Sequence, residues 1–277
     1  MELSETFPPP PAAPGSRTVE RQRWERVAAG FRDFFDAPST RYYRRCEEAL
    51  VERAAGPLAG RRVLKLDLWN EAFNTRILHW MAEQGAEVHG LDLSRNVTFA
   101  ARRNRRRTAA PLRLLSADIR ELPFAAGSFD LVYTMGTIEH IAEYRQTLAE
   151  VRRVLVPGGR AIVGVPHRWN LFLRPLLVEL LARCGLYPYA PEKSFSAPEL
   201  RRDLEAAGLA VLARTGILTL PGLVRMADVY LYNRGIPLYR LSPLVVAPFE
   251  LLETRWRWPG RFGYLLTMVA ERPAAQA

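Results

Sequence analysis

The 277-residue sequence predicts an α/β fold, a doubly wound and mainly parallel sheet with helices on both faces. Strand-like apolar runs alternate with helical patterns along most of the chain, and a hydrophobic content of 48% supplies a full core. The predicted strands are residues 62–67, 87–93, 111–115, 129–134, 160–165, 209–214 and 263–270. The predicted helices are residues 18–36, 40–55, 71–84, 94–107, 142–155, 171–184 and 198–207.

Proline, glycine and small polar residues set the limits of these elements. The run Asp36-Ala37-Pro38-Ser39 divides the first two helices, and Gly85 provides a left-handed stop after the third. The turn Pro157-Gly158-Gly159 precedes the fifth strand. The predicted division is a disordered tail (1–17), a helical lid (18–60), an α/β core (61–216 and 260–273) and an apolar helical cap (217–259).

Composition narrows the class of protein. The formal net charge is +10, and the positive field either helps to attract anionic lipids or an acidic substrate, or is ordinary solvated surface. Cys46 and Cys184 have neither metal-ligand nor redox spacing, so we expect no disulfide framework or zinc site. The first residues do not form a signal peptide, and charges interrupt the most apolar region, which predicts a cytoplasmic protein without a membrane span.

Two aspartates follow consecutive strands on the expected binding edge of the sheet. Asp92 ends the second strand, where a carboxylate can accept two hydrogen bonds from a ribose diol; alternatively it caps the helix that follows Ser94. Asp118 follows the third strand, where its carboxylate can accept a hydrogen bond from the amino group of an adenine. The apolar turn at 121–124 would pack against that base. At this spacing, the two carboxylates indicate a nucleoside site.

The two aspartates are followed by two further segments, SFDLVYTMGTIEHI (128–141) and LAEVRRVLVPGG (148–159), and together these features form an ordered set of motifs. This order resembles the class I S-adenosylmethionine-dependent methyltransferases, in particular the subgroup that includes ubiquinone and menaquinone methyltransferases. The resemblance is strong over residues 60–168 and weak over 191–213. It implies a Rossmann-like seven-stranded methyltransferase sheet, S-adenosyl-L-methionine as cofactor and methyl transfer as the activity.

The resemblance also implies roles for individual residues. Asp92 and the adjacent Leu93 would bind the ribose end of the cofactor, and Asp118 and Ile119 would hold the adenine. Met135 would lie near the methionine end.

The pair Glu139-His140 falls where the family often has Glu-His at the mouth of the site, which makes both residues catalytic candidates. A neutral His140 can take a proton from a substrate hydroxyl near neutral pH, or it can brace the helix that begins nearby. Glu139 has the same two interpretations, with the structural one favoured. The ubiquinone O-methyltransferases add an upstream glutamate as metal ligand, but Gly136 stands at that position, so no metal site is expected.

The loop after the first strand, DLWNEA (67–72), contains no glycine, although family members usually carry a Gly-x-Gly-x-Gly-like loop there. The first strand can be matched to the family's pattern in two ways. In one register Lys65 stands at the position of the acid that usually ends this strand, and in the other Asp67 is that acid. The loop therefore binds S-adenosylmethionine through side chains, binds another ligand, or has lost binding. We favour the first outcome, because the carboxylates of Asp67 and Glu71 can meet the methionine ammonium while Trp69 covers it.

The substrate must be inferred from the aromatic-rich stretch 169–258, which forms either ordinary core or a ligand slot. The segment 241–249 with its flanking arginines also suits a surface that dips into lipid, at the inner face of the membrane. We expect a hydrophobic small molecule, such as a quinone, isoprenoid, polyketide or lipid precursor. A nucleic-acid partner is not expected, because the basic run 102–107 lacks interleaved aromatics.

Two other classes of function remain open at this point. The domain can be a non-catalytic binding or scaffold protein whose cap is an interface. Alternatively, it can use S-adenosylmethionine for chemistry other than methyl transfer.

Overall fold

A computed structural model of the chain describes residues 17–104, 111–185, 187, 189, 192–256 and 262–274. The predicted disordered tail falls almost entirely outside these residues. The strands are β1 (Arg62–Lys65), β2 (Glu87–Asp92), β3 (Leu112–Ser116), β4 (Phe129–Met135), β5 (Leu155–Pro166), β6 (Ala210–Ile217) and β7 (Leu265–Glu271). The α-helices are α1 (Arg17–Ala29), α2 (Pro38–Ala55), α3 (Trp69–Phe73), α4 (Ile77–Glu83), α5 (Arg95–Asn104), α6 (Tyr144–Val154), α7 (Arg174–Arg183), α8 (Ala197–Ala206), α9 (Gly222–Asn233) and α10 (Ser242–Trp256).

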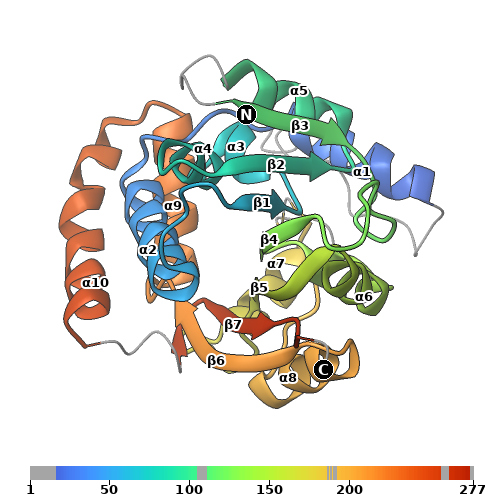
Figure 1. Cartoon of the computed structure of the whole chain (residues 1–277). Coiled ribbons are helices and arrows are strands. Elements are labelled where there is room, and N and C mark those ends of the chain that lie inside the picture. Colours follow the sequence, from blue (N-terminus) through green and yellow to red (C-terminus); the bar gives the residue numbers. More distant parts are fainter. Residues whose placement is uncertain are drawn as a thin grey trace.

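The seven strands form one sheet in the order β3-β2-β1-β4-β5-β7-β6 (Figure 1). All pairings are parallel except those of β7, which runs antiparallel between β5 and β6. The strand order reverses between β1 and β4, and a ligand crevice opens beyond the carboxyl ends of the strands at such a switch point. The predicted doubly wound sheet is confirmed.

Successive strand residues bury their side chains on opposite faces of the sheet, as the pleat requires. Val63 and Tyr133 join a core cluster with helices α2 to α5, whereas Leu64 and Val132 join a second cluster with α6 and α8. The sheet is thus covered on both sides by apolar helix faces, and its strands read as nearly continuous apolar runs.

Some predicted elements have different limits. The predicted helix 71–84 is two short helices, because Arg76 between them has a left-handed backbone (φ 57°) and the amide of Asn74 bonds to Asn70 instead of solvent. The predicted helix 18–36 stops at Ala29. Strand β5 starts before the predicted turn at 157–159, which lies within it as an irregularity in the pairing with β4.

The C-terminal helices α9 and α10 flank α2 on one side of the molecule, joined by a 3-10 helix η4 (Pro237–Leu241) (Figure 1). Glu253 of α10 fixes this arrangement by accepting hydrogen bonds from the backbone amides of Leu218 and Thr219, at 3.0 and 2.9 Å. Within the described residues, no helix has the length and apolarity to cross a bilayer.

Candidate active site

A pocket of about 1010 Å³ lies at the carboxyl ends of the central strands and continues towards α7 and α9. Eight of the nine predicted site residues line it: Asp67, Asp92, Leu93, Asp118, Ile119, Met135, Glu139 and His140. The ninth, Glu71, does not. Residues far apart in the sequence therefore meet at the switch point, as the parallel sheet predicts.

Lys65, the last residue of β1, makes hydrogen bonds and ion pairs that stabilise the glycine-free loop (67–72). Its side chain is fully buried, and Nζ donates to the backbone oxygen and Oδ1 of Asp67, each at 2.8 Å. It also lies 3.1 Å from Oε2 of Glu71. Burial alone would lower the pKa of Lys65, but the charges of Asp67 and Glu71 raise it overall, so the lysine is charged.

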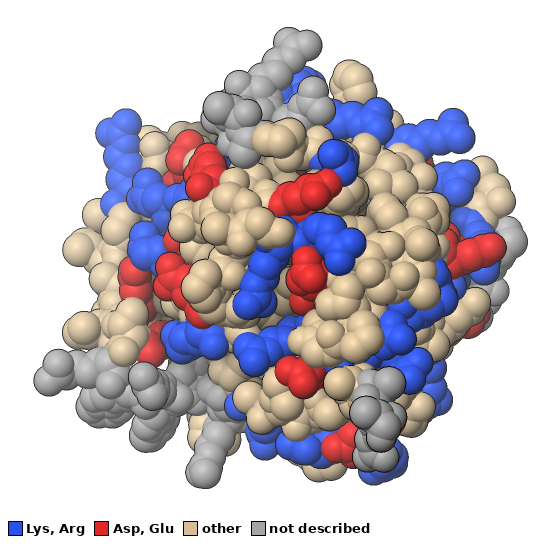
Figure 2. Space-filling model, viewed as in Figure 1, with Lys and Arg blue, Asp and Glu red and all other residues tan. Residues whose placement is uncertain are grey.

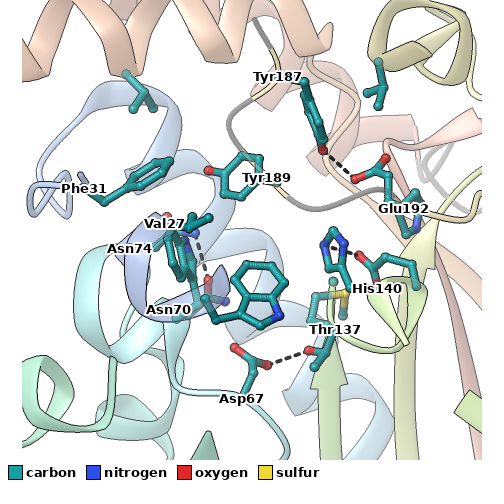
Figure 3. Close-up of a pocket in the computed structure, with 18 of the residues that line it drawn as sticks. Val27, Phe31, Asp67, Asn70, Asn74, Thr137, His140, Tyr187, Tyr189 and Glu192 are labelled. Atoms are coloured by element: carbon teal, nitrogen blue, oxygen red, sulfur yellow. Dashed lines mark hydrogen bonds and ion pairs between the residues drawn. The ribbon is translucent and has the colours of Figure 1, made fainter. Parts of the chain in front are cut away.

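Asp67 presents its carboxylate to the pocket, and Glu71 does not. The second oxygen of Asp67 accepts a hydrogen bond of 2.9 Å from Thr137 Oγ1 (Figure 3). The Glu71 side chain is fully buried, and its Oε1 accepts the backbone N–H of Leu78 at the start of α4. Glu71 is therefore a support beneath the loop, because its oxygens are directed at Lys65 and α4 rather than at the pocket.

A second polar layer joins the loop to α2. Glu47 of α2 is fully buried and accepts hydrogen bonds from Asn70 Nδ2 (3.1 Å), Tyr133 Oη (2.7 Å) and the Thr75 hydroxyl. Burial raises its pKa to about 7, although these donors oppose the shift. Sequence reasoning missed Glu47, since nothing in an amphipathic helix shows that one glutamate faces a distant loop.

Asp92 braces the loop as well as lining the pocket. One oxygen accepts the backbone N–H of Leu68 at 3.0 Å, and the other accepts that of Ser94 at 2.8 Å. The side chain that caps α5 is that of Ser94, whose Oγ accepts the backbone N–H of Val97 at 3.2 Å, so the alternative role of Asp92 as the helix cap is wrong. Burial raises the pKa of Asp92 to about 7 despite these two donors. Each carboxylate oxygen has further acceptor capacity, which a ribose diol would use.

Asp118 is held by an arginine that the sequence did not single out. Arg120 donates to both oxygens of Asp118 and also reaches Glu20 of α1 (2.7 Å) and Glu143 (2.9 Å). Burial acts to raise the pKa of Asp118, but the hydrogen bonds from Arg120 lower it overall, so the group is ionised. Arg120 thereby ties α1 to the edge of the pocket.

Aromatic rings from α1 and the loop roof the pocket. Trp69 packs edge-on to Phe31 with ring centroids 4.8 Å apart and lies 5.8 Å from Tyr189. Trp24 of α1 lies 5.1 Å from the ring of His140. Trp69 belongs to the glycine-free loop, so a large ring forms this wall of the pocket. Its partners Trp24 and Phe31 were not predicted as site residues.

The catalytic candidates stand beside a buried ion pair. Arg174 and Glu192 are bonded in two places, one of them at 3.0 Å, and Tyr187 Oη donates to Glu192 at 2.5 Å (Figure 3). Glu139 Oε1 lies 3.9 Å from His140 Nε2, while its other oxygen is buried without a hydrogen bond. Burial and the charge of Glu192 raise the pKa of Glu139 well above its usual range, which favours the protonated form of this carboxyl.

We take His140 rather than Glu139 as the candidate base, because burial disfavours the carboxylate form of Glu139 and an imidazole can take up a proton near neutral pH. Arg174 of α7 lies outside the two ranges of the family resemblance, and Glu192, before α8, lies where the resemblance is weak. Their roles could not be read from the sequence. Among the described residues, no three His, Cys, Asp or Glu side chains gather in a way that would hold a metal ion.

Comparisons with known proteins identify the family. A family described as "Methyltransferase domain" matches residues 72–163, starting at the last residue of the glycine-free loop. Demethylmenaquinone methyltransferase of Thermus thermophilus is 33% identical over 190 residues, which cover 62% of this chain and 82% of that protein. Ubiquinone biosynthesis O-methyltransferase of Rhizobium rhizogenes is 28% identical over 175 residues, covering 61% and 68%.

A comparison with solved structures agrees with the fold described above. A chain from the complex of the Haloferax volcanii Trm112 methyltransferase activator and a methyltransferase superposes with a TM-score of 0.63 at 20% identity, covering 93% of this chain and 99% of that one. The chain belongs to the class I S-adenosylmethionine-dependent methyltransferase family. It is a methyltransferase, and its cofactor is S-adenosylmethionine.

The residues present fit this cofactor without the glycines. Asp67 offers a carboxylate of fixed orientation to a cationic group, and Asp92 offers one to a pair of hydroxyl donors. Both are restrained from behind by hydrogen bonds, so their orientation does not depend on glycine-like backbone freedom.

Proposed function

We propose that the protein methylates a hydrophobic small molecule, such as a quinone, isoprenoid, polyketide or lipid precursor. One observation carries this proposal: the pocket that begins at the strand-end carboxylates continues without interruption between α7 and α9. Apolar side chains of these two helices line that part: Leu177, Val178, Leu181, Leu223, Met226 and Val229. An acceptor bound there would lie between the apolar cap and the cofactor end of the site.

In the proposed mechanism the protein mainly positions its two substrates. Asp67 holds the methionine ammonium, Asp92 and Leu93 hold the ribose, Asp118 and Ile119 hold the adenine, and Met135 lies at the methionine end. When bound, S-adenosylmethionine supplies an electrophilic methyl group for in-line displacement. The aromatic roof of Trp24 and Trp69 excludes water from this end of the pocket, and His140 takes the proton of the acceptor hydroxyl.

Mass spectrometry of reaction mixtures tests the proposed reaction. Purified protein is incubated with S-adenosylmethionine and a panel of reduced quinones, phenolic polyketides and isoprenoid alcohols, and in parallel with a separate set of small polar hydroxyl compounds. A product heavier by one methyl group, formed together with S-adenosylhomocysteine, is expected for a member of this panel. Methylation of only small polar acceptors would contradict the proposed substrate class.

Replacing His140 by glutamine is expected to lower kcat by about 10²- to 10⁴-fold, the usual contribution of a general base. Calorimetry should show unchanged affinity for S-adenosylhomocysteine, since no cofactor role is assigned to this ring. The matched control is His79→Gln, because His79 is buried but outside the pocket. A full rate in His140→Gln would leave the histidine a purely structural role beside Trp24.

We also propose that the cap contacts an anionic membrane surface peripherally. Leu241 and Leu244, on η4 and α10, are 54% and 74% exposed, and arginines 234 and 240 lie close to them in the chain. On the face shown in Figure 2, basic side chains are interspersed with acidic ones and with uncharged residues. Such mixing fits a surface whose adhesion comes from apolar insertion together with a few arginines.

Vesicle sedimentation tests this contact. The variant Leu241→Glu/Leu244→Glu is expected to lose binding to vesicles of phosphatidylcholine and phosphatidylglycerol, because two carboxylates replace the inserting side chains. The control Phe99→Glu/Leu212→Glu adds the same charge at two exposed positions on α5 and β6, and should bind like the parent. Equal loss in both variants would show a simple net-charge effect.

A further inference from the structure

Arg225 is an arginine of the pocket whose printed partners in the described part of the chain are all uncharged. Arg225 of α9 lines the pocket and donates to Asn74 Oδ1 at 3.2 Å and to Ser39 Oγ at 3.4 Å. Within the part of the chain that the structure describes, no carboxylate oxygen lies within 4.0 Å of its guanidinium. A guanidinium has five N–H donors, and these two acceptors are uncharged, so Arg225 keeps both its charge and free donor capacity.

The other arginines discussed above behave differently. Arg120 is neutralised by Asp118, Glu20 and Glu143, and Arg174 by Glu192. Both are about 5% exposed and serve to hold elements together. Arg225 differs from both, because it is half-buried and lines the pocket, so a molecule that enters the pocket can reach its remaining donors.

The surroundings of Arg225 orient it towards a ligand. The guanidinium carbon of Arg225 lies 5.0 Å from the ring centre of the buried Tyr43, and this contact restricts the orientation of the guanidinium. Its charge is also the leading influence that opposes the rise in the pKa of the buried Tyr189, so the Tyr189 hydroxyl lies within its field. In the described part of the chain this hydroxyl has no hydrogen-bond partner, which leaves it as a second donor beside the guanidinium.

The position within the pocket separates this group from the catalytic candidates. Asn74, the residue that holds Arg225, lies on the side of Tyr189 away from His140 (Figure 3). Leu223, Met226 and Val229, from the same helix as Arg225, line the pocket with apolar surface. A molecule that spans the chamber would thus meet a base at one end and a cation at the other.

We propose that Arg225, oriented by Asn74, forms an anion subsite that binds a carboxylate or phosphate group of the methyl acceptor. This inference rests on the proposed function in that it takes the chamber to be the acceptor site. The acceptor is then an amphiphile with an apolar body, a nucleophilic atom near His140 and an acidic group at Arg225. Two or three charge-assisted hydrogen bonds from a planar fork suit either acid.

Three probes with the same alkyl chain test the subsite: decanoate, decyl phosphate and decanol. Binding to the full-length protein is followed by the fluorescence of Trp24 and Trp69, which line the pocket. At least one acid is expected to bind about tenfold or more tightly than decanol, which corresponds to one charge-assisted hydrogen bond. The stronger acid identifies the group. Equal affinity of all three probes would overturn the proposal.

Matched variants assign the effect to Arg225. Arg225→Met should remove the preference for the acid, whereas Arg183→Met removes the same charge from the exposed end of α7 and should keep it. If Arg225→Met does not fold, Asn74→Asp serves instead, because a carboxylate beside the guanidinium occupies the subsite. If the Arg225 and Asn74 variants still bind the acid more tightly than decanol, the assignment of the anion subsite to Arg225 is overturned.

A separate measurement distinguishes failure of the subsite from failure of the proposed function. Affinity for S-adenosylhomocysteine is measured in every variant and should not change, since Arg225 is assigned no cofactor contact. Equal probe affinities with intact cofactor binding and methylation of an uncharged acceptor would refute the subsite alone. An acid preference without methylation of any hydrophobic acceptor would refute the proposed substrate class alone.

Discussion

Replacing Asp92 by alanine is expected to weaken S-adenosylhomocysteine binding by about a hundredfold or more. In our proposal its carboxylate accepts two charge-assisted hydrogen bonds from the ribose, each worth about 1.5 to 3 kcal/mol. It also fixes the loop through Leu68 and the start of α5 through Ser94. Calorimetric titration measures the change directly.

Asp130→Ala is the matched control. Asp130 also accepts a backbone N–H, from Arg62 at 2.8 Å, but lies at the opposite end of the strands from the pocket. Its loss should leave cofactor affinity unchanged. Similar losses in both variants would point to general destabilisation instead of a ribose contact.

The ionisation of Asp92 also predicts how the affinity for S-adenosylhomocysteine depends on pH. Burial raises its pKa to about 7, and the charged form is the better acceptor for the hydroxyls. Affinity should therefore be full above about pH 8 and fall by at most about tenfold per pH unit below 7, as the carboxylate takes up a proton. In Asp92→Asn this dependence should disappear, and a flat profile in the parent would contradict the assignment.

The second large effect is expected from Lys65→Met, which should lower the free energy of unfolding by about 3 to 5 kcal/mol. The substitution leaves Asp67 and Glu71 buried without their shared cation. Urea unfolding monitored by circular dichroism measures the loss. Lys65→Met/Glu71→Gln should recover much of it, because one of the two orphaned charges is then absent.

The chain provides its own control, since Lys193 is its other lysine. Lys193 lies 2.8 Å from Glu199, but its side chain is 38% exposed. Because solvent screens such a pair, Lys193→Met should cost no more than about 1 kcal/mol. If both lysine variants lost equally little stability, the buried pairs of Lys65 would not be what holds the loop.

The fold and the positions of most site residues could be predicted from the sequence for a simple physical reason. Parallel strands bring their carboxyl ends together, so acids that follow strands, such as Asp92 and Asp118, meet wherever the strand order reverses. The apolar runs that specify β1, β2 and β4 are local patterns. Met135 and the pair Glu139-His140 were placed at the site by the family resemblance, and the structure has all three on the same pocket.

The remaining features depend on side-chain direction and on distant segments. Glu71 was expected in the pocket, but the turn at α3 directs it inward, because the charged Lys65 must find partners at the end of a buried strand. A lysine within an apolar strand, followed by acids two and six positions later, was the available signal. Glu47, Arg120 and Arg225 gave no comparable signal, since their partners lie far away in the sequence.

The replacement of backbone glycines by a side-chain scaffold has an evolutionary consequence. Asp67 depends on Lys65 and Thr137, and Asn70 depends on Glu47, so the residues of the loop are energetically coupled. Glycine at position 67 would leave Lys65 with one buried carboxylate fewer, and glycine at position 70 would leave Glu47 without one of its donors. Substitutions at Asp67, Asn70 and Thr137 should therefore have non-additive effects, so that this loop can change only by several substitutions together without losing stability on the way.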